Sequence, residues 1–236
     1  MAVTVSSFST TANGFSQEQI DLFKDADVIF CETKPQMESV MDQLGVSLDG
    51  KKIFSIYETY ESEPDETPIW GRVKYVLETY DKKSIVIISD DGLPNIVDPY
   101  SKLISKLVAA GIHINITPNV SSLTSAIILA DIENDQFCFG GILVIWEDYI
   151  KKMKALKDIS DKMPLILFMV IPDYIPGEMM MGELSNIFGP EREAMIMHSI
   201  GTPKARTYKT QVKNLWARHE PHLPEPFTLV IYPPAT

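Results

Sequence analysis

Cysteine is scarce in this chain, and long apolar segments are missing. The two cysteines among 236 residues, Cys31 and Cys138, lie in strand-like apolar runs without metal-type spacing, so we expect core residues rather than a disulfide framework. No apolar run approaches the roughly 18 residues that span a bilayer, the longest being Pro164–Pro172. The amino terminus also lacks the basic segment and long apolar core of a secretory signal. We therefore expect a cytoplasmic protein without a membrane partner.

Basic residues are also few. Lysine and arginine total 21 against 32 aspartates and glutamates, which gives a formal net charge of −11. Because proteins hold nucleic acid largely by neutralising phosphates, such a chain needs a locally basic face to bind RNA. The densest basic segments, Lys151–Lys157 and Lys204–Arg218, are interpreted as solvated helix faces. Nucleic acid is thus a permitted partner but not the favoured one.

The chain does contain enough apolar sequence, 45% of its residues, for one large domain or two small ones. Strand-like and helix-like segments alternate up to about residue 140, which predicts a doubly wound, largely parallel sheet. After Gly140-Gly141 the connections become longer and richer in proline. We therefore predict two α/β domains, an N-terminal one over 1–141 and a C-terminal one over 142–236.

The expected elements follow from hydrophobic period, caps and breakers. In the first domain we expect strands at 3–8, 28–31, 53–56, 85–88 and 112–117, and helices at 16–24, 35–44, 67–80, 101–110 and 121–129. Ser16 and Gln19 form a capping-box pattern at the start of the first helix. In the second domain we expect helices at 146–157, 182–188 and 211–219, and strands at 165–171, 194–199 and 227–232.

Two polar turns are the strongest functional signal. Ser89–Pro94 follows one apolar strand, Pro118–Ser122 follows the next, and a helix is expected soon after each. In an α/β sheet, ligands bind outside the carboxyl ends of the strands, where turns and helix starts present backbone N–H groups. Gly92 allows close approach of a ligand because it has no Cβ. The two turns together predict one small-molecule site.

The same turns carry a resemblance to a known family. Ser89–Pro94 reads S-D-D-G-L-P and, with Asp98-Pro99, resembles the S-D-A-G-T-P…D-P-G signature of the tetrapyrrole methylase superfamily, in the branch of bacterial ribosomal-RNA ribose 2′-O-methyltransferases. Pro118–Ser122 stands where that branch has P-G-P-S-A. Ala26–Glu32 resembles its A-D-V-I with a following acidic residue, and Phe137–Gly141 its F-x-F-x-G. The resemblance covers most of the first 141 residues.

The resemblance implies S-adenosylmethionine as the cofactor, bound in a cleft between the two domains, and a homodimer. It also implies a set of cofactor-binding positions, carried over one by one from the matching motifs. They are Ser89, Asp90, Asp91, Gly92, Pro94, Asp98, Pro118, Asn119, Ser121, Ser122, Phe139 and Met169. Of these, Met169 belongs to the strand where relatives line the adenine slot.

Methyl transfer from a sulfonium is an in-line displacement, so positioning of donor and acceptor supplies much of the rate and no metal is required. Glu32 is the candidate general base because it follows a strand at the expected ligand edge; the alternative is an ordinary strand-end carboxylate. Asp90, Asp91 and Asp98 have turn capping as their alternative role. The His219-x-x-His222 pair is not expected to bind zinc, since Pro221 and the lack of a nearby Cys or carboxylate cluster argue against it.

Three departures from the family pattern bear on the substrate. Asn119 replaces a glycine beside the cofactor, Tyr100 replaces the glycine of D-P-G, and Glu32–Pro35 lacks the arginine of the branch's E-D-T-R. Asparagine tolerates left-handed backbone, whereas a tyrosine does so poorly. Together with the net charge, these changes favour a small-molecule or protein methyl acceptor over ribosomal RNA. The alternative function is a non-catalytic relative that binds the cofactor or another nucleotide.

Overall fold

The computed structural model describes residues 2–8, 14–55, 67–90, 92–96, 100–117, 121–132, 135–144, 148–171, 176–200, 204–219 and 226–234. The chain divides into two compact units, residues 1–121 and 122–236, each built on a five-stranded sheet. This division lies earlier than the boundary expected near residue 141. The helix Ser122–Leu129 packs in the core of the second unit, and the strand Cys138–Val144 pairs with Leu165–Val170 in its sheet. The α/β class with two domains is as the sequence predicted.

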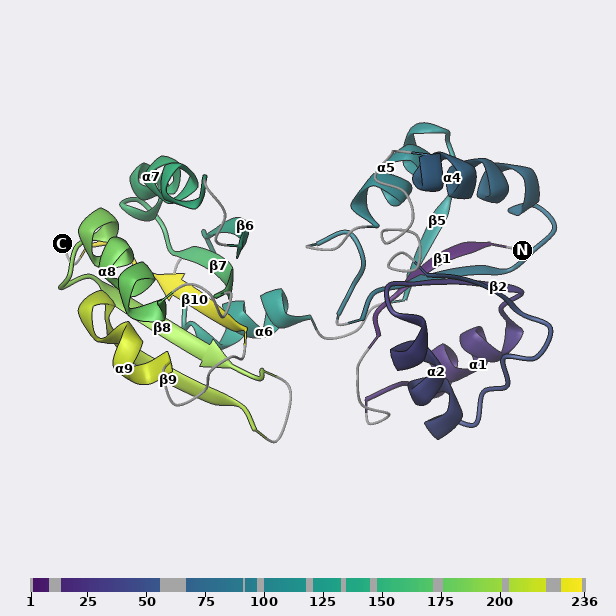
Figure 1. Ribbon diagram of the computed structural model, residues 1–236, viewed down its shortest axis with the longest axis horizontal. Helices are drawn as coiled ribbons and strands as arrows, with labels where there is room; N and C mark the ends of the chain where they lie inside the picture. The colour runs from purple at the N-terminus through teal and green to yellow at the C-terminus, as the bar shows by residue number, and fades with distance from the viewer. Residues whose placement is uncertain are drawn as a thin grey trace. The chain divides into compact units, whose positions relative to one another are not determined.

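The first sheet is wholly parallel. Its strands are β1 (Val3–Ser6), β2 (Val28–Cys31), β3 (Lys52–Ser55), β4 (Ile85–Ile88) and β5 (Ile114–Thr117). They lie in the order β3-β2-β4-β1-β5, and every neighbouring pair is parallel. The helices are α1 (Gln17–Asp25), α2 (Lys34–Gln43), α4 (Thr67–Thr79) and α5 (Ser101–Ala109). Figure 1 shows α1 and α2 on one face of this sheet and α4 and α5 on the other, which is the doubly wound arrangement.

Burial on both faces explains why the central strands β2 and β4 are continuous apolar runs. In β2, Val28 and Phe30 pack with α4 and α5, while Ile29 and Cys31 pack with α1 and α2. All four side chains are at most 1% exposed. Each such aliphatic or aromatic side chain contributes about 1.5–3 kcal/mol through removal from water.

The capping box predicted for α1 is confirmed. The Gln19 backbone N–H donates to Ser16 Oγ at 3.2 Å, and the Ser16 N–H donates to Gln19 Oε1 at 3.1 Å. Two otherwise unpaired donors at the start of α1 are thereby satisfied.

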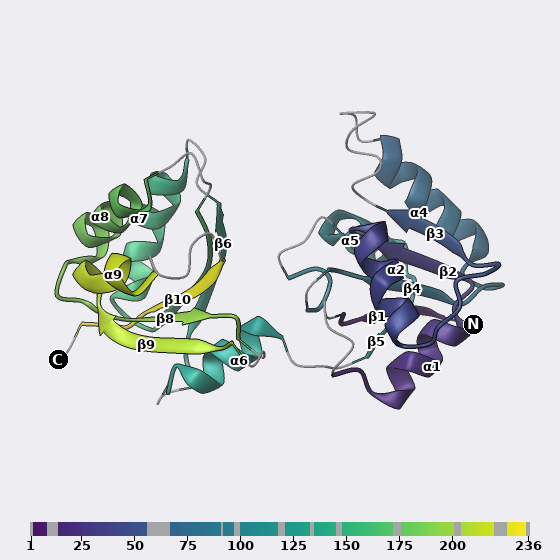
Figure 2. The same ribbon diagram turned by 60° about the horizontal axis from the view of Figure 1, so that its bottom comes forward.

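The second sheet is mixed. It contains β6 (Cys138–Val144), β7 (Leu165–Val170), β8 (Glu193–His198), β9 (Arg206–Gln211) and β10 (Phe227–Ile231), in the order β6-β7-β10-β8-β9. Among these described strands, only β6 and β7 form a parallel pair. The helices are α6 (Ser122–Leu129), α7 (Tyr149–Ser160), α8 (Gly177–Phe188), the 3₁₀ turn η1 (Val212–Asn214) and α9 (Leu215–His219). The cores and Figures 1 and 2 place α7, α8 and α9 on one face and α6 on the other.

One expectation for this unit is wrong. Lys204–Arg218 is not a continuous helix face, since Arg206–Gln211 forms strand β9 before the 3₁₀ turn and the short helix α9. The reason is the position of β9 at the edge of the sheet, where none of its side chains is buried and its sequence, RTYKTQ, needs few apolar residues. The other basic segment, Lys151–Lys157, does lie on a helix, α7. Within the described ranges, none of the helices has the length and apolar character of a membrane span.

Tyr232 provides a pH-dependent contact in the second unit. Its hydroxyl donates to the Ala130 carbonyl at 2.7 Å, and its side chain is 9% exposed. Burial, aided by the negative charges of Glu193 and Asp131, raises the pKa of Tyr232 to about 12. Because the unfolded value is near 10, the stability due to this group is present below about pH 10 and is lost as the pH rises towards 12.

We expect the free energy of unfolding to fall by roughly 2–3 kcal/mol over that window in the wild type, and by less in Tyr232→Phe. Urea unfolding at several alkaline pH values measures this. Tyr80→Phe is the control, since Tyr80 is 40% exposed. Parallel curves for the wild type and Tyr232→Phe would show that Tyr232 does not titrate with folding.

Candidate functional site

The turns after β1, β2 and β4 meet at one edge of the first sheet, because the three strands are parallel neighbours. β1 and β4 lie side by side, yet the helices that follow them, α1 and α5, cover opposite faces (Figure 1). The carboxyl ends of such a pair of strands form the crevice in which open α/β sheets bind ligands. Ser89 and Asp90 directly follow β4, as the sequence predicted.

The loop after β1 and the turn after β4 are joined by backbone. Phe8 N–H donates to the Gly92 carbonyl and Gly92 N–H donates to the Phe8 carbonyl, both at 2.9 Å. Gly92 has a φ of +82°, a conformation that side chains disfavour, and no described heavy atom lies within 4 Å of where a Cβ would be. The Ser89 hydroxyl donates to the Gly92 carbonyl at 3.1 Å, and Pro94 is buried. Gly92 is therefore fixed in position beside open space.

The Gln19 side chain also contacts the residues at the end of β1. The sequence predicted its role in the capping box but not this second contact. Its amide nitrogen donates to the Ser7 carbonyl at 3.1 Å and lies 3.3 Å from both the Ser6 and the Ser7 hydroxyl oxygens. Gln19 is 1% exposed, so these polar contacts form away from water. The loop is thus held from α1 as well as from Gly92.

Asp90 caps a helix in another part of the chain. Its carboxylate accepts from the Thr33 backbone N–H at 3.1 Å and from the Thr33 hydroxyl. Thr33 is the N-cap of α2, and its own side chain makes no capping hydrogen bond. Asp90 therefore supplies the cap, and its negative charge lies at the positive end of α2. This contact with a residue 57 positions away was not among the roles expected for Asp90, which were ligand binding and capping of its own turn. A carboxylate retains further acceptor positions for a ligand.

Glu32 makes the reciprocal contact, from the turn after β2 to the turn after β4. Its carboxylate accepts the Asp90 backbone N–H at 3.1 Å, and Glu32 is 9% exposed. The two carboxylates thus hold the β2 turn and the β4 turn together, each accepting from the other turn's backbone. This places Glu32 at the same carboxyl edge of the sheet as Ser89, Asp90, Gly92 and Pro94, where the sequence predicted the ligand.

The remaining predicted positions fall elsewhere. Asp91, Asp98, Pro118 and Asn119 lie outside the described residues. Ser121 is buried at the end of the first unit. Three further positions, Ser122, Phe139 and Met169, belong to the second unit, where Ser122 is the first residue of α6.

Met169 does not present its side chain to a ligand slot. It is fully buried in the core between the second sheet and helices α7 and α8. Because side chains alternate along a strand, its neighbour Phe168 lies on the opposite face, where its ring contacts Phe139 edge-on at 5.0 Å between centroids. The sequence identified the strand, but its two faces could not be told apart from a continuous apolar run.

The departure at Tyr100 is accommodated without strain. Tyr100 is the N-cap of α5 with φ −75° and ψ −8°, an ordinary right-handed conformation, so the backbone here does not need the family's glycine. The side chain is fully buried.

Among the residues that the structure describes, no group of three or more His, Cys, Asp or Glu is placed to bind a metal ion. His222 lies outside those residues. His219 instead stacks on His198 in the second unit, with 5.3 Å between ring centroids and 6° between planes. This pair joins α9 to β8, which the sequence did not predict.

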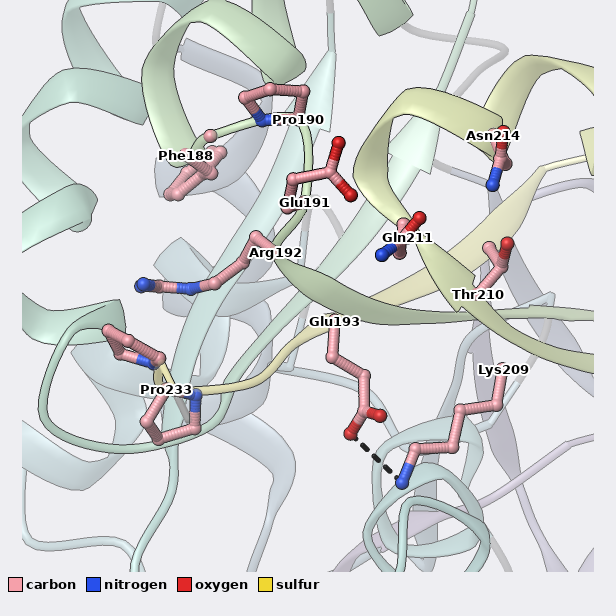
Figure 3. A pocket seen from close by; sticks show the side chains of 12 residues that line it. Phe188, Pro190, Glu191, Arg192, Glu193, Lys209, Thr210, Gln211, Asn214 and Pro233 are labelled. Atoms are coloured by element: carbon pink, nitrogen blue, oxygen red, sulfur yellow. Dashed lines mark ion pairs between the residues drawn. The ribbon is translucent and has the colours of Figure 1, made fainter. Parts of the chain in front are cut away.

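A hollow of about 810 Å³ lies in the second unit (Figure 3). Its charged lining residues pair with lysines or carboxylates nearby: Lys209 lies 2.9 Å from Glu193, and Lys213 lies 2.7 Å from Glu191. Its lining includes none of the positions predicted to bind the cofactor. The turns of the first sheet, not this hollow, therefore remain the candidate site.

Residues 12–215 match the sequence profile of the family described as Tetrapyrrole (Corrin/Porphyrin) Methylases. The chain belongs to the tetrapyrrole methylase family. The superfamily suggested by the S-D-D-G-L-P turn is thereby confirmed. Since the match extends to residue 215, membership covers both units.

Two relatives of this family member are named "Ribosomal RNA small subunit methyltransferase I". That of Leptospira biflexa serovar Patoc is 29% identical over 149 residues, covering 63% of this chain and 57% of that protein. That of Coprothermobacter proteolyticus is 24% identical over 185 residues, 77% of this chain and 75% of that protein. The match to the Mycobacterium tuberculosis protein of the same name covers 38% of that protein's length. The chain therefore spans about half the length of several curated relatives that it matches.

Solved structures share the fold. Diphthine synthase is similar with a TM-score of 0.65 and 14% identity, covering 98% of this chain and 90% of that one. Uroporphyrin-III C-methyl transferase from Thermus thermophilus, solved with S-adenosyl homocysteine, is similar with a TM-score of 0.58 and 14% identity over 98% of this chain and 97% of that one. At these identities the likeness establishes the tetrapyrrole-methylase-like fold of the chain.

Proposed function

We propose that this tetrapyrrole methylase family member is an S-adenosylmethionine-dependent methyltransferase with its cofactor at the turns of the first sheet. The observation that carries the proposal is the pair of hydrogen bonds joining Phe8 and Gly92 at the carboxyl ends of β1 and β4. This contact leaves open space beside a glycine at the point where α/β sheets bind ligands. Family membership and the S-adenosyl homocysteine complex of a fold relative support this choice of cofactor.

The residues present fit such a ligand. A bound S-adenosylmethionine would supply an activated methyl group on its sulfonium. The backbone at Ser89 and Gly92 would contact its polar groups, and the backbone at Ser121-Ser122, before and at the start of α6, offers further N–H donors. Asp91, Asp98, Pro118 and Asn119, carried over from the family motifs, are part of the proposed set, as are Phe139 and the backbone of Met169.

Glu32 is proposed as the general base. Its carboxylate lies at the ligand edge and is oriented by the Asp90 N–H, so it could take a proton from an acceptor held there. The reaction otherwise rests on positioning, because methyl transfer needs donor and acceptor in line and in contact. The non-catalytic alternative predicts cofactor binding without turnover.

The acceptor is proposed to be a small molecule or a protein rather than RNA. Lysines of the basic segments form ion pairs with carboxylates: Lys157 with Asp161, Lys209 with Glu193 and Lys213 with Glu191. Lysines whose charge is compensated in this way contribute less to holding phosphates. Ribosomal RNA is the second candidate, favoured by the names of the relatives. A homodimer and a cytoplasmic location stay predictions from the resemblance and the sequence.

S-adenosylhomocysteine is expected to stabilise the protein. At about 100 times its dissociation constant, a ligand that binds only the folded state adds roughly 2.7 kcal/mol to the free energy of unfolding. Calorimetric titration gives the dissociation constant, and urea unfolding with and without ligand gives the stabilisation. No heat and no shift of the unfolding midpoint at millimolar ligand would exclude the proposed cofactor.

RNA binding is expected to be weak. In a titration of structured RNA with the protein, we expect no association whose affinity falls steeply between low and higher salt. Charge reversal at the exposed residues Lys151 and Lys154 of α7, and separately at Lys209, tests the two basic segments. Steeply salt-dependent binding that these changes remove, followed by methylation of that RNA, would establish RNA as the acceptor class.

A further inference from the structure

Tyr100 makes contacts that explain why a large residue stands where the family has glycine. Its hydroxyl donates to the carbonyl of Cys31, and it lies 3.5 Å from the carbonyl of Phe54. Cys31 is the last residue of β2 and Phe54 is the third residue of β3. The hydroxyl therefore sits across the carboxyl ends of two neighbouring strands, directly before Glu32.

A second set of donors reaches the same place from α4. The guanidinium of Arg72 donates to the Ser55 carbonyl, and the Ser55 hydroxyl donates to the Glu32 carbonyl at 2.7 Å. Arg72 is 8% exposed and Ser55 is 5% exposed, so the contacts are largely shielded from water. Hydrogen bonds in such surroundings are stronger, and costly to leave unmade.

These contacts fix the backbone on both sides of the Cys31–Glu32 peptide. From there the Glu32 carboxylate holds the Asp90 N–H, and the Asp90 carboxylate holds Thr33. A shift of the β2 end would consequently move the turn after β4, where the cofactor is proposed to bind. The end of β2 and the turn after β4 are thus connected by hydrogen bonds, without any repacking of core side chains.

We propose that Tyr100 is a positioning residue, which acts with Arg72 and Ser55 to hold Glu32 and, through it, the Ser89–Gly92 turn in a ligand-binding geometry. The part that concerns the cofactor rests on the proposed function. The competing explanation is that Tyr100 only fills space, since its ring also contacts Phe30 edge-on at 6.5 Å between centroids. The two explanations differ in whether the hydroxyl matters beyond stability.

The test removes the hydroxyl alone. Tyr100→Phe is expected to weaken S-adenosylhomocysteine binding about five- to tenfold, the effect of losing one buried hydrogen bond that the ligand-competent turn depends on. Tyr75→Phe is the matched control: its ring contacts Phe54 edge-on at 5.1 Å, and its hydroxyl makes no hydrogen bond with any residue that the structure describes. The affinity of the control is expected to stay within about twofold of the wild type.

A second measurement does not need the cofactor. Hydrogen exchange on the ligand-free protein should show faster exchange of the Asp90 and Thr33 amides in Tyr100→Phe, by a similar factor, relative to the Val5 amide in β1. If the wild type fails to bind S-adenosylhomocysteine but the exchange changes, the cofactor proposal fails and the bracing role stands. Two results would overturn the positioning role of Tyr100. One is an equal change of exchange at all three amides in Tyr100→Phe. The other is an unchanged affinity of Tyr100→Phe for S-adenosylhomocysteine when the wild type binds it.

Discussion

Replacement of Glu32 by glutamine is expected to slow methyl transfer by about 10²- to 10⁴-fold, the usual contribution of a general base. Glutamine retains an oxygen that can accept the Asp90 N–H, so the turn keeps its geometry. It cannot take a proton, however, and only the chemical step should suffer. Single-turnover transfer of a labelled methyl group at saturating cofactor, with an acceptor found by screening small molecules, proteins and RNA, measures the effect.

The matched control is Glu38→Gln on α2, where an exposed glutamate 3.9 Å from Lys34 loses its charge without touching the site. In both variants the affinity for S-adenosylhomocysteine should stay within about threefold of the wild type. An unchanged rate in Glu32→Gln would mean that Glu32 is only a strand-end carboxylate and that the reaction needs no base from it. A large loss of affinity would instead place Glu32 among the groups that shape the cofactor site.

Replacement of Asp90 by alanine is expected to have two effects. Affinity for S-adenosylhomocysteine should fall by about 10- to 100-fold, because the turn that carries Asp90 loses its connection to Thr33. The free energy of unfolding should fall by about 2–3 kcal/mol, because α2 loses its cap and a charged hydrogen-bond acceptor. Calorimetric titration and urea unfolding measure the two separately.

The Asp90→Asn variant separates the effect of the Asp90 hydrogen bonds from the effect of its negative charge. Its amide can accept from the Thr33 N–H and donate to the Thr33 hydroxyl, so we expect most of the stability to return. If affinity returns too, Asp90 acts by holding the turn; if affinity stays low, its negative charge acts on the ligand. Full affinity in Asp90→Ala would show that the Ser89–Gly92 turn is not part of the cofactor site.

Much of the first unit could be predicted because its signals are local. Val28–Cys31 and Ile85–Ile88 are buried on both faces, so their apolar runs gave the strand bounds correctly. The Ser16–Gln19 box gave the start of α1. The ligand edge inferred from the two polar stretches after strands stays a prediction. The family signature lies in these same short segments, which is why the superfamily could be inferred from them.

The contacts that shape the site could not be predicted, because they join residues far apart in the chain. Tyr100 contacts Cys31, 69 residues away in the sequence, and Asp90 contacts Thr33, 57 residues away. The sequence around Tyr100 does not show whether its hydroxyl makes a hydrogen bond to a distant strand or whether its ring only fills space. The edge strand Arg206–Gln211 was missed for a different reason, since an exposed strand with few apolar residues carries no hydrophobic pattern.

The most direct test of the central claim is a crystal structure of the protein with S-adenosylhomocysteine bound at a concentration well above its dissociation constant. We expect the ligand against the Ser89–Pro94 turn, with the Gly92 backbone in contact and Asp90 still hydrogen-bonded to Thr33. A ligand bound instead in the hollow near Glu191 and Lys209 of the second unit, away from every residue of that turn, would contradict it.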